Sequence, residues 1–288
     1  MTIIELFQAV AAVSGLLFVI SSMLAMGLSL TVNQIIQPLK NARLVVLALV
    51  ANFVLVPLLA YAITLVIPLE DDLATGLIVL AAAAGAPFLP KLVQIAEGNT
   101  ALAVGMMALL MVVTIFYLPL VLPYLLPGVE VDPWAIAQSL IMSMLIPLAI
   151  GLLIKAYASD TADRWQPVMN KISNLAILLL MVFGLGLNLS NILGLLGTGG
   201  ILALVLFVIG SLAIGLVLGG RNPAVRSVMG LGTAQRNVSA AIVVTAANFT
   251  TGDTMAFILV ASIVLLLVLM PTAKRLGSRS QTAPADAA

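Results

Sequence analysis

Two stretches decide the fold, Gly85-Ala86-Pro87-Phe88-Leu89-Pro90-Lys91 and Gly230-Leu231-Gly232-Thr233-Ala234-Gln235-Arg236-Asn237-Val238-Ser239. Each interrupts an otherwise apolar run, and each contains one cation. A proline removes a backbone donor and breaks a helix, and glycine weakens one. The sequence therefore predicts two broken helices, one in each half of the chain. The residues expected at the breaks are Gly85, Pro87, Pro90, Gly230 and Gly232.

The composition places these breaks in a membrane protein. Of the 288 residues, 62% are apolar and 8% are charged, with a mean hydropathy of +1.24. A soluble domain is roughly a quarter charged, so a soluble globular enzyme and a disordered chain are both excluded. Lys and Arg number 12 against 11 Asp and Glu, which leaves no basic patch for nucleic acid. The absence of His and Cys removes the usual zinc and haem ligands.

The apolar stretches predict an all-α polytopic membrane protein, because about 20 apolar residues cross a bilayer as a helix. We expect nine transmembrane helices, over 5–30, 43–68, 72–97, 101–126, 134–156, 168–192, 198–218, 224–248 and 253–276.

The loop charges predict an orientation. Apart from Lys91 and Arg236, every Lys and Arg falls in alternate loops, and the opposite loops contain acidic residues only. Since cationic loops stay in the cytoplasm, we expect the N-terminus outside, the C-terminus inside and a location in the plasma (inner) membrane.

The two remaining cations predict a binding site. Lys91 and Arg236 each cost about 2.5–3.5 kcal/mol at a helix centre, and no deep carboxylate pairs with them in the sequence. One explanation is that both side chains reach the membrane surface or bond backbone carbonyls. The other is that they face an internal cavity that binds an organic anion, which we favour because broken helices mark transporter sites. Polar side chains expected beside the two cations are Thr233, Gln235, Asn237, Ser239, Ser29, Thr31 and Asn188.

Short repeats suggest that the two halves are related. The sequence Gly27-Leu28-Ser29-Leu30-Thr31 ends the first expected span, and Gly186-Leu187-Asn188-Leu189-Ser190 ends the sixth. These spans would run in opposite directions, so the repeats would be inverted, as in alternating-access transporters.

The same stretches resemble the bile acid:sodium symporter family. Met26-Gly27-Leu28-Ser29-Leu30 is similar to its M-G-L-T-L, and the stretches from Gly85 to Val104 and from Gly230 to Phe249 resemble its two crossover helices. The resemblance implies a core domain with two crossing broken helices beside a panel domain. It also implies transport of an organic anion with sodium ions.

The resemblance divides the chain into parts. It implies panel helices over 1–36 and 133–197 and core helices over 37–132 and 198–276, with crossover breaks near 85–91 and 232–237. Residues 277–288 are expected to form a disordered cytoplasmic tail.

Several sodium-binding positions of the family are replaced here. Its Ser-Asn pair falls on Leu89 and Pro90, its Glu on Gly232 and its Gln on Arg236, whereas its Asn is retained as Asn237. Sodium prefers several hard oxygen ligands. Our hypothesis is that Lys91 and Arg236 replace the two bound sodium ions, so sodium is possible but doubtful and no other cofactor or metal is expected.

Other functions remain open. A buried Lys91 would titrate and couple transport to protons, and a transport-inactive sensor would keep the same fold. An intramembrane Ser/Lys enzyme is disfavoured because no serine lies within one helical turn of Lys91. A cation/proton antiporter is also disfavoured, because it would need an intramembrane carboxylate and the expected spans have none at depth. The sequence leaves the identity of the anion and the oligomeric state unknown.

Overall fold

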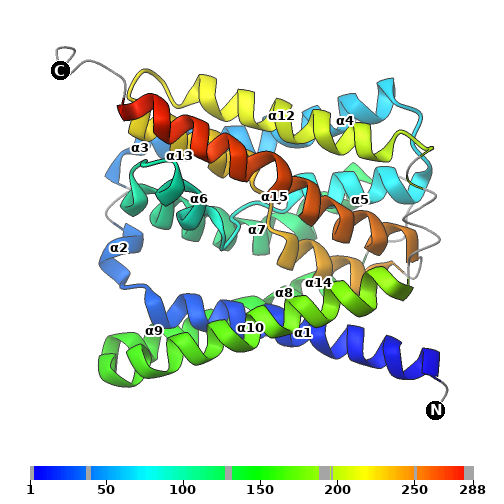
Figure 1. The fold of residues 1–288 in the computed structure, drawn as a ribbon, viewed down its shortest axis with the longest axis horizontal. Coiled ribbons are helices and arrows are strands. Elements are labelled where there is room, and N and C mark those ends of the chain that lie inside the picture. The colour runs from blue at the N-terminus through cyan, green and yellow to red at the C-terminus, as the bar shows by residue number, and fades with distance from the viewer. Residues whose placement is uncertain are drawn as a thin grey trace.

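The computed structural model describes residues 3–36, 40–126, 132–187, 195, 197–249 and 252–281. Within these ranges all regular secondary structure is helical (Figure 1). The helices of the first half are α1 (Ile3–Ser29), α2 (Val32–Ile36), α3 (Ala42–Val50), α4 (Val56–Val66), α5 (Asp71–Ala82), α6 (Leu89–Ile95) and α7 (Thr100–Leu125). Those of the second half are α8 (Pro133–Leu140), α9 (Ile146–Tyr157), α10 (Ser159–Leu187), α12 (Gly200–Leu218), α13 (Pro223–Ala234), α14 (Val238–Asn248) and α15 (Gly252–Gln281).

Two π-helical turns, η2 (Ala51–Leu55) and η3 (Ile141–Leu145), join α3 to α4 and α8 to α9. A proline, Pro57 or Pro147, follows each turn in the next helix. Because proline has no N–H, it cannot continue the regular hydrogen-bond ladder, and π turns in helices often mark functional positions.

Seven helices in the described part of the chain are long and apolar enough to cross a membrane. They are Leu6–Ser29, Ala42–Val66, Thr100–Leu125, Pro133–Tyr157, Ser159–Gly184, Gly200–Leu218 and Asp253–Ser278. The prediction of an all-α polytopic membrane protein is confirmed. The expected third and eighth spans are instead pairs of shorter helices, α5 with α6 and α13 with α14.

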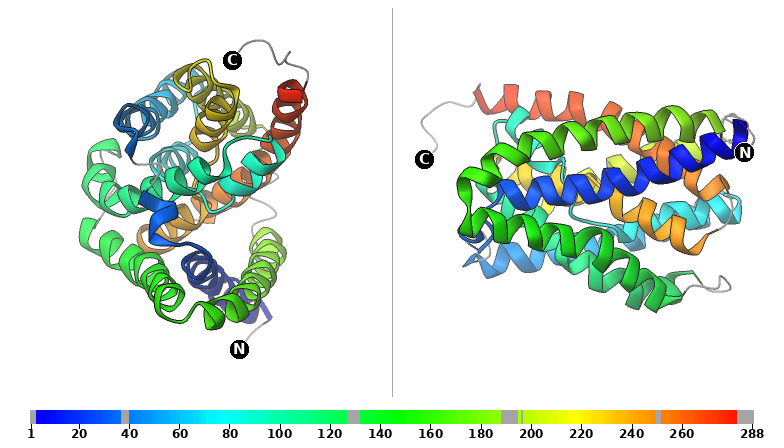
Figure 2. Two further views of the ribbon diagram at one scale, coloured as in Figure 1. Left: turned by 90° about the vertical axis from the view of Figure 1, so that its left-hand side faces the viewer. Right: turned by 90° about the horizontal axis from the view of Figure 1, so that it is seen from below.

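The helices form two groups. Helix α1 packs along α10 and against α9, and these three helices gather on one side of the molecule (Figure 2). The broken pairs α5/α6 and α13/α14 lie in the other group together with α7, α12 and α15. Helix α2, expected with the panel, packs on α7, and α8 contacts both α7 and α14. Helix α15 continues to Gln281, so 277–281, expected in a loose tail, are helical.

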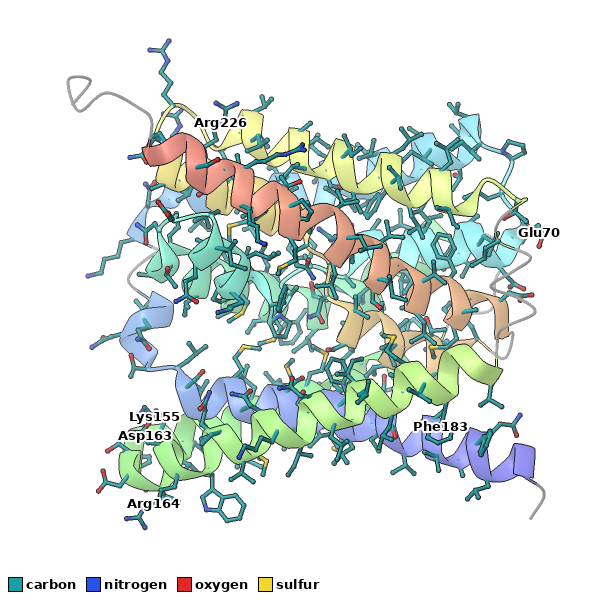
Figure 3. The ribbon with its side chains drawn as sticks, viewed as in Figure 1. Glu70, Lys155, Asp163, Arg164, Phe183 and Arg226 are labelled. Carbon is teal, nitrogen blue, oxygen red and sulfur yellow. The ribbon has the colours of Figure 1, made fainter. Side chains whose placement is uncertain are left out.

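The charged loops occupy opposite ends of the molecule. Lys155, Arg164 and Arg226 lie at one end and Glu70 lies at the other (Figure 3). Lys155 pairs there with Asp163. This separation is the one that the alternation of cationic and acidic loops predicts, and the orientation in the membrane stays a prediction.

Glycines allow α1 and α9 to pack closely. A Cβ atom built on Gly27 would lie 2.3 Å from the carbonyl oxygen of Leu148 and 2.9 Å from the Cα atom of Gly151. A Cβ atom on Gly151 would meet the carbonyl oxygen of Leu24 at 2.6 Å. Small residues at helix interfaces are typical of membrane proteins because association there depends on close van der Waals packing.

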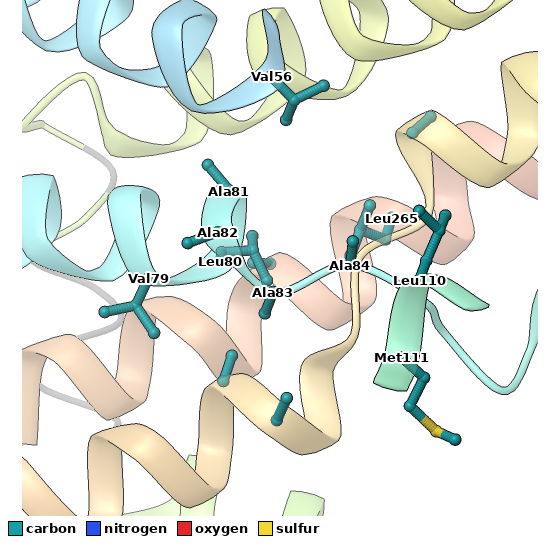
Figure 4. Packing of buried hydrophobic residues seen from close by; sticks show 14 of the residues in the cluster. Val56, Val79, Leu80, Ala81, Ala82, Ala83, Ala84, Leu110, Met111 and Leu265 are labelled. Carbon is teal, nitrogen blue, oxygen red and sulfur yellow. The ribbon is translucent and has the colours of Figure 1, made fainter. Parts of the chain in front are cut away.

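The first break, between α5 and α6, is an extended link that α7 supports. Gly85 has a φ of +78°, and a Cβ atom there would lie 2.1 Å from the backbone nitrogen of Met111. The hydroxyl of Thr114 accepts a hydrogen bond from the Ala84 N–H and donates one to the Ala84 carbonyl, both at 3.0 Å. Figure 4 shows Ala83 and Ala84 on this link, beside the connection between α13 and α14.

The second break is shorter than expected. It comprises Gln235–Asn237, between α13 and α14. Gly230 and Gly232 lie inside α13 instead, where they allow close packing. A Cβ atom on Gly230 would lie 2.6 Å from a side-chain carbon of Leu216, and one on Gly232 would lie 2.7 Å from the Met106 side chain. Pro90 likewise lies in the first turn of α6, where proline is tolerated, so only Gly85 and Pro87 lie in a break.

We predict that Gly27→Ala lowers the thermal midpoint of the detergent-solubilised protein, because the added methyl group would force α1 away from α9. Overpacking of this kind costs about 1–3 kcal/mol. Gly186→Ala in α10 is the matched control, because a Cβ atom there has no neighbour within 4 Å among the described residues. Equal midpoints for the two variants would contradict the close packing.

We also predict that Thr114→Val destabilises the protein, because an isosteric methyl group leaves the buried N–H and carbonyl of Ala84 unpaired. Each such loss costs about 1–3 kcal/mol. Thr64→Val is the control, since the Thr64 hydroxyl donates only to the carbonyl of Tyr61 in its own helix. The thermal midpoint should fall for Thr114→Val alone, and a similar fall in both variants would refute the role of Thr114.

Candidate functional site

Arg236, in the second break, is completely enclosed, with 0% of its surface exposed. Its Nη2 atom donates to the carbonyl of Ala81 at 2.6 Å, and Nε donates to that of Leu80 at 3.3 Å. Its Nη1 atom donates to Asn52 Oδ1 at 2.8 Å and to the Thr233 carbonyl at 3.0 Å. The guanidinium is therefore surrounded by four oxygen atoms, which we call the oxygen cage.

Three of the cage oxygens belong to helix ends. Leu80 and Ala81 are among the last residues of α5, and Thr233 is in the last turn of α13. The last carbonyls of a helix have no partner within it, and they carry the negative end of the helix dipole. Two helix C-termini thus stabilise the positive charge, and the guanidinium in turn pairs the carbonyls of Ala81 and Thr233, while the Leu80 carbonyl also accepts from the Ala83 N–H.

The fourth oxygen belongs to Asn52, which is also fully buried. Its Nδ2 atom donates to the Ala48 carbonyl at 3.0 Å and to the Thr233 hydroxyl at 3.5 Å, which directs Oδ1 to Arg236. Asn52 lies in the π turn η2. Sequence reasoning missed this residue, although a lone amide in an apolar span is a usable signal.

Asn237, the residue after Arg236, ties the two breaks together. Its N–H donates to the Ala83 carbonyl at 2.9 Å, and its Nδ2 atom donates to the Gly85 carbonyl at 3.1 Å. Its Oδ1 atom accepts from the Ala240 N–H and caps α14. Asn237 therefore holds the start of α14 against the end of α5.

Lys91 does not join Arg236 in the oxygen cage. It is exposed on α6, and its Nζ atom donates to Gln94 Oε1 at 3.2 Å. The reason is helical spacing: Leu89, Leu92 and Val93 form the buried face of α6, and Lys91 lies on the opposite face. The expectation that both cations lie where the two broken helices meet is wrong for Lys91.

The other predicted site residues separate into two groups. Thr233, Gln235 and Ser239 are buried near Arg236, and Gln235 Oε1 has no hydrogen-bond partner in the described part of the chain. Ser29 and Thr31 are exposed and make local bonds, to the Met26 carbonyl and to the N–H of Gln34. Asn188 lies outside the described residues.

A cavity of about 670 Å³ lies between the two groups of helices. Its walls come from α1, α8, η3 and α10 on one side and from α14 and α15 on the other. The lining residues are Gln8, Ala11, Ala12, Gly15, Leu16, Ile20, Ser139, Met142, Ser143, Leu180, Gly184, Leu187, Ile242, Val243, Ala246, Ala247, Met255 and Leu259. These parts of α1, α10 and α14 lie toward the end that carries Glu70 (Figures 1 and 3).

The Leu89 and Pro90 positions and the oxygen cage offer no free set of oxygen ligands for a sodium ion. Leu89 and Pro90 offer no side-chain oxygen, and the four oxygens of the cage already accept from Arg236. In the second break Gln235 Oε1 is the buried side-chain oxygen that has no hydrogen-bond partner among the described residues, and a sodium ion needs several such ligands. Within the described ranges, no group of three or more acidic residues is arranged to hold a metal. A second cation beside the guanidinium would also be repelled by it.

Comparison with known proteins identifies relatives. The chain is 26% identical over 186 residues to the probable sodium/metabolite cotransporter BASS3, chloroplastic, of Arabidopsis thaliana, which covers 64% of this chain and 43% of the relative. It is 33% identical over 144 residues to the probable cotransporter BASS2, chloroplastic, of Oryza sativa subsp. japonica, covering 49% and 34%.

A bacterial relative, the uncharacterized sodium-dependent transporter YocS of Bacillus subtilis (strain 168), is 25% identical over 179 residues, covering 59% of this chain and 54% of the relative. The chain spans about half the length, or less, of these curated relatives.

The model of the Sodium Bile acid symporter family matches residues 16–195, which include the first break and end before α13. Its members and the relatives are transporters, not enzymes. The apolar helices, the interrupted pair α5/α6 and this match over more than half of the chain agree, and the chain belongs to the Sodium Bile acid symporter family.

Proposed function

We propose that this protein is a secondary transporter that moves a small organic solute across the membrane by alternating access. The cavity between the two helix groups carries this proposal. Its volume of about 670 Å³ lies in the usual range for small-molecule sites. A site walled by two groups opens to one side or the other when the groups rock against each other.

The two breaks meet where Asn237 bonds the carbonyls of Ala83 and Gly85, a region that we call the crossing. The crossing links the cavity to the group of helices that contains α5 and α13. Helix α14 supplies Ile242, Val243, Ala246 and Ala247 to the cavity wall, and Asn237 fixes its first turn to α5. We propose that α5, α13 and α14 move together as part of one body. In this scheme α5/α6 and α13/α14 are the third and eighth of nine spans, and the two halves are inverted repeats.

The lining favours a solute with a largely apolar body. Its only polar side chains among the described residues are Gln8, Ser139 and Ser143, and it contains no charged residue. The hydroxyls of Ser139 and Ser143 already donate to carbonyls of their own helix, at 2.9 and 2.5 Å, and retain acceptor capacity. The solute therefore gains affinity chiefly by burying apolar surface.

The prediction that the solute is an organic anion loses its basis in the structure. It rested on two unpartnered cations, but Arg236 is enclosed by the oxygen cage and Lys91 is exposed on α6. We propose that a negative charge is not what the cavity recognises. Proton coupling through Lys91 also loses its basis, because that coupling requires burial.

We predict that Ala12→Phe prevents solute binding, because Ala12 faces the cavity and a phenyl ring would fill part of it. The loss of affinity should be at least about tenfold, or about 1.4 kcal/mol. Val13→Phe, at an exposed neighbouring position that does not line the cavity, should bind like the wild type. The measurement is the thermal midpoint in detergent with a panel of organic acids and their methyl esters.

If the protein is a transporter, the compound that raises the thermal midpoint most should, when labelled, also show counterflow into proteoliposomes that contain the protein. Binding without counterflow would support the sensor alternative instead.

We predict that methyl cholate raises the thermal midpoint at least as much as cholate does. The two probes share the steroid body suggested by the family name and differ in charge, and no cation in the described lining would favour the carboxylate. A shift with cholate alone would show that the site recognises the anion and would restore the original prediction.

A further inference from the structure

The oxygen cage has the composition of a cation site. It consists of the carbonyls of Leu80, Ala81 and Thr233 and the amide oxygen of Asn52, at 2.6–3.3 Å from the guanidinium nitrogens. All four atoms are neutral oxygens, the type of ligand that hard cations prefer. The guanidinium donates no hydrogen bond to a carboxylate within the described chain, so the cage and the helix ends supply the compensation for its charge.

The cage oxygens are directed toward the guanidinium by elements that are themselves fixed. The end of α5 is held by Asn237, which bonds the carbonyls of Ala83 and Gly85. Asn52 is oriented by its bonds to Ala48 and Thr233. Removal of the guanidinium would thus leave four buried acceptors close together, with two helix C-termini aimed at one point.

We infer that Arg236 is a resident cation that makes the crossing independent of soluble sodium, and that the cage it leaves when truncated is a binding site for a guanidinium-type cation. The wild-type cage needs no ion from solution because its ligand is covalently attached. This inference about Arg236 goes beyond the proposed function, and the experiment that tests it measures no transported solute. Its failure would leave the cavity proposal standing, and failure of the cavity would leave this inference standing.

The experiment compares thermal midpoints in detergent at equal ionic strength in choline, potassium or sodium chloride, or in choline chloride with millimolar ethylguanidinium. We expect the wild-type midpoint to be the same in sodium, potassium and choline. We expect Arg236→Ala to lower the midpoint by on the order of 10 °C, because truncation leaves buried acceptors unpaired. Ethylguanidinium should recover a large part of this loss, saturably and without stabilising the wild type.

Arg226→Ala is the matched control, since Arg226 is exposed at the end of the molecule (Figure 3). Its midpoint should not respond to ethylguanidinium. The inference is overturned if sodium stabilises the wild type relative to choline. It is also overturned if ethylguanidinium recovers Arg236→Ala no better than it stabilises Arg226→Ala.

Arg236→Ser provides a second variant if Arg236→Ala does not fold. Serine removes the fixed charge, keeps a small polar group and, like alanine, leaves the space of the guanidinium empty. Its midpoint should also rise with ethylguanidinium, by several degrees over choline alone, and a flat response would refute the cage as a cation site. If neither variant can be purified, the wild-type comparison of sodium with choline still decides whether the crossing needs a soluble ion.

Discussion

The structure depends on how a positive charge is accommodated where neither water nor lipid can solvate it. Desolvation of an ion is expensive, and the cost is recovered only when every donor finds an acceptor in good geometry. Arg236 meets this requirement through carbonyls that also need a partner, because α5 and α13 both end at the crossing. The breaks and the cation thus stabilise each other. A continuous α5 would have no free carbonyl at Ala81, and a neutral residue 236 would leave that carbonyl unpaired, whereas the Leu80 carbonyl also accepts from the Ala83 N–H at 3.2 Å.

Helix α14 connects the hydrogen bonds at the crossing to the cavity. Helix α14 starts at the crossing, where Asn237 joins it to α5, and continues as a wall of the cavity. On the other side, the wall includes the π turn η3, which presents Met142 and Ser143. The other π turn, η2, presents Asn52 to Arg236. Each π turn therefore supplies side chains to one of the two regions, η2 to the oxygen cage and η3 to the cavity, as is common for π turns at functional positions.

The sequence predicted the membrane class, the two interruptions and the place of Arg236 at the second one, because hydropathy and helix-breaking residues act locally. It did not predict that Arg236 is fully enclosed, and its bonds to backbone carbonyls are those of the explanation in which the two cations bind no anion. It did not predict that Lys91 points away from the crossing. Two prolines near Lys91 suggested that the break extends to it, but Pro90 lies in the first turn of α6, where its missing N–H costs nothing. Likewise Gly230 and Gly232 were assigned to a break, whereas their role is close packing against Leu216 and Met106. The partners that decide the two glycines are distant in sequence, whereas the direction of Lys91 follows from where α6 begins.

The difference between the two cations also changes what the site can bind. With Lys91 on the exposed face of α6 and Arg236 saturated by oxygens, the cavity retains mainly apolar contacts and a few hydroxyl and amide groups. A buried cation that already makes its hydrogen bonds offers little to a passing carboxylate, because any new contact would have to replace one of them. The guanidinium therefore organises the helix ends at the crossing, and in the proposed function selectivity would come from the shape and apolar surface of the cavity.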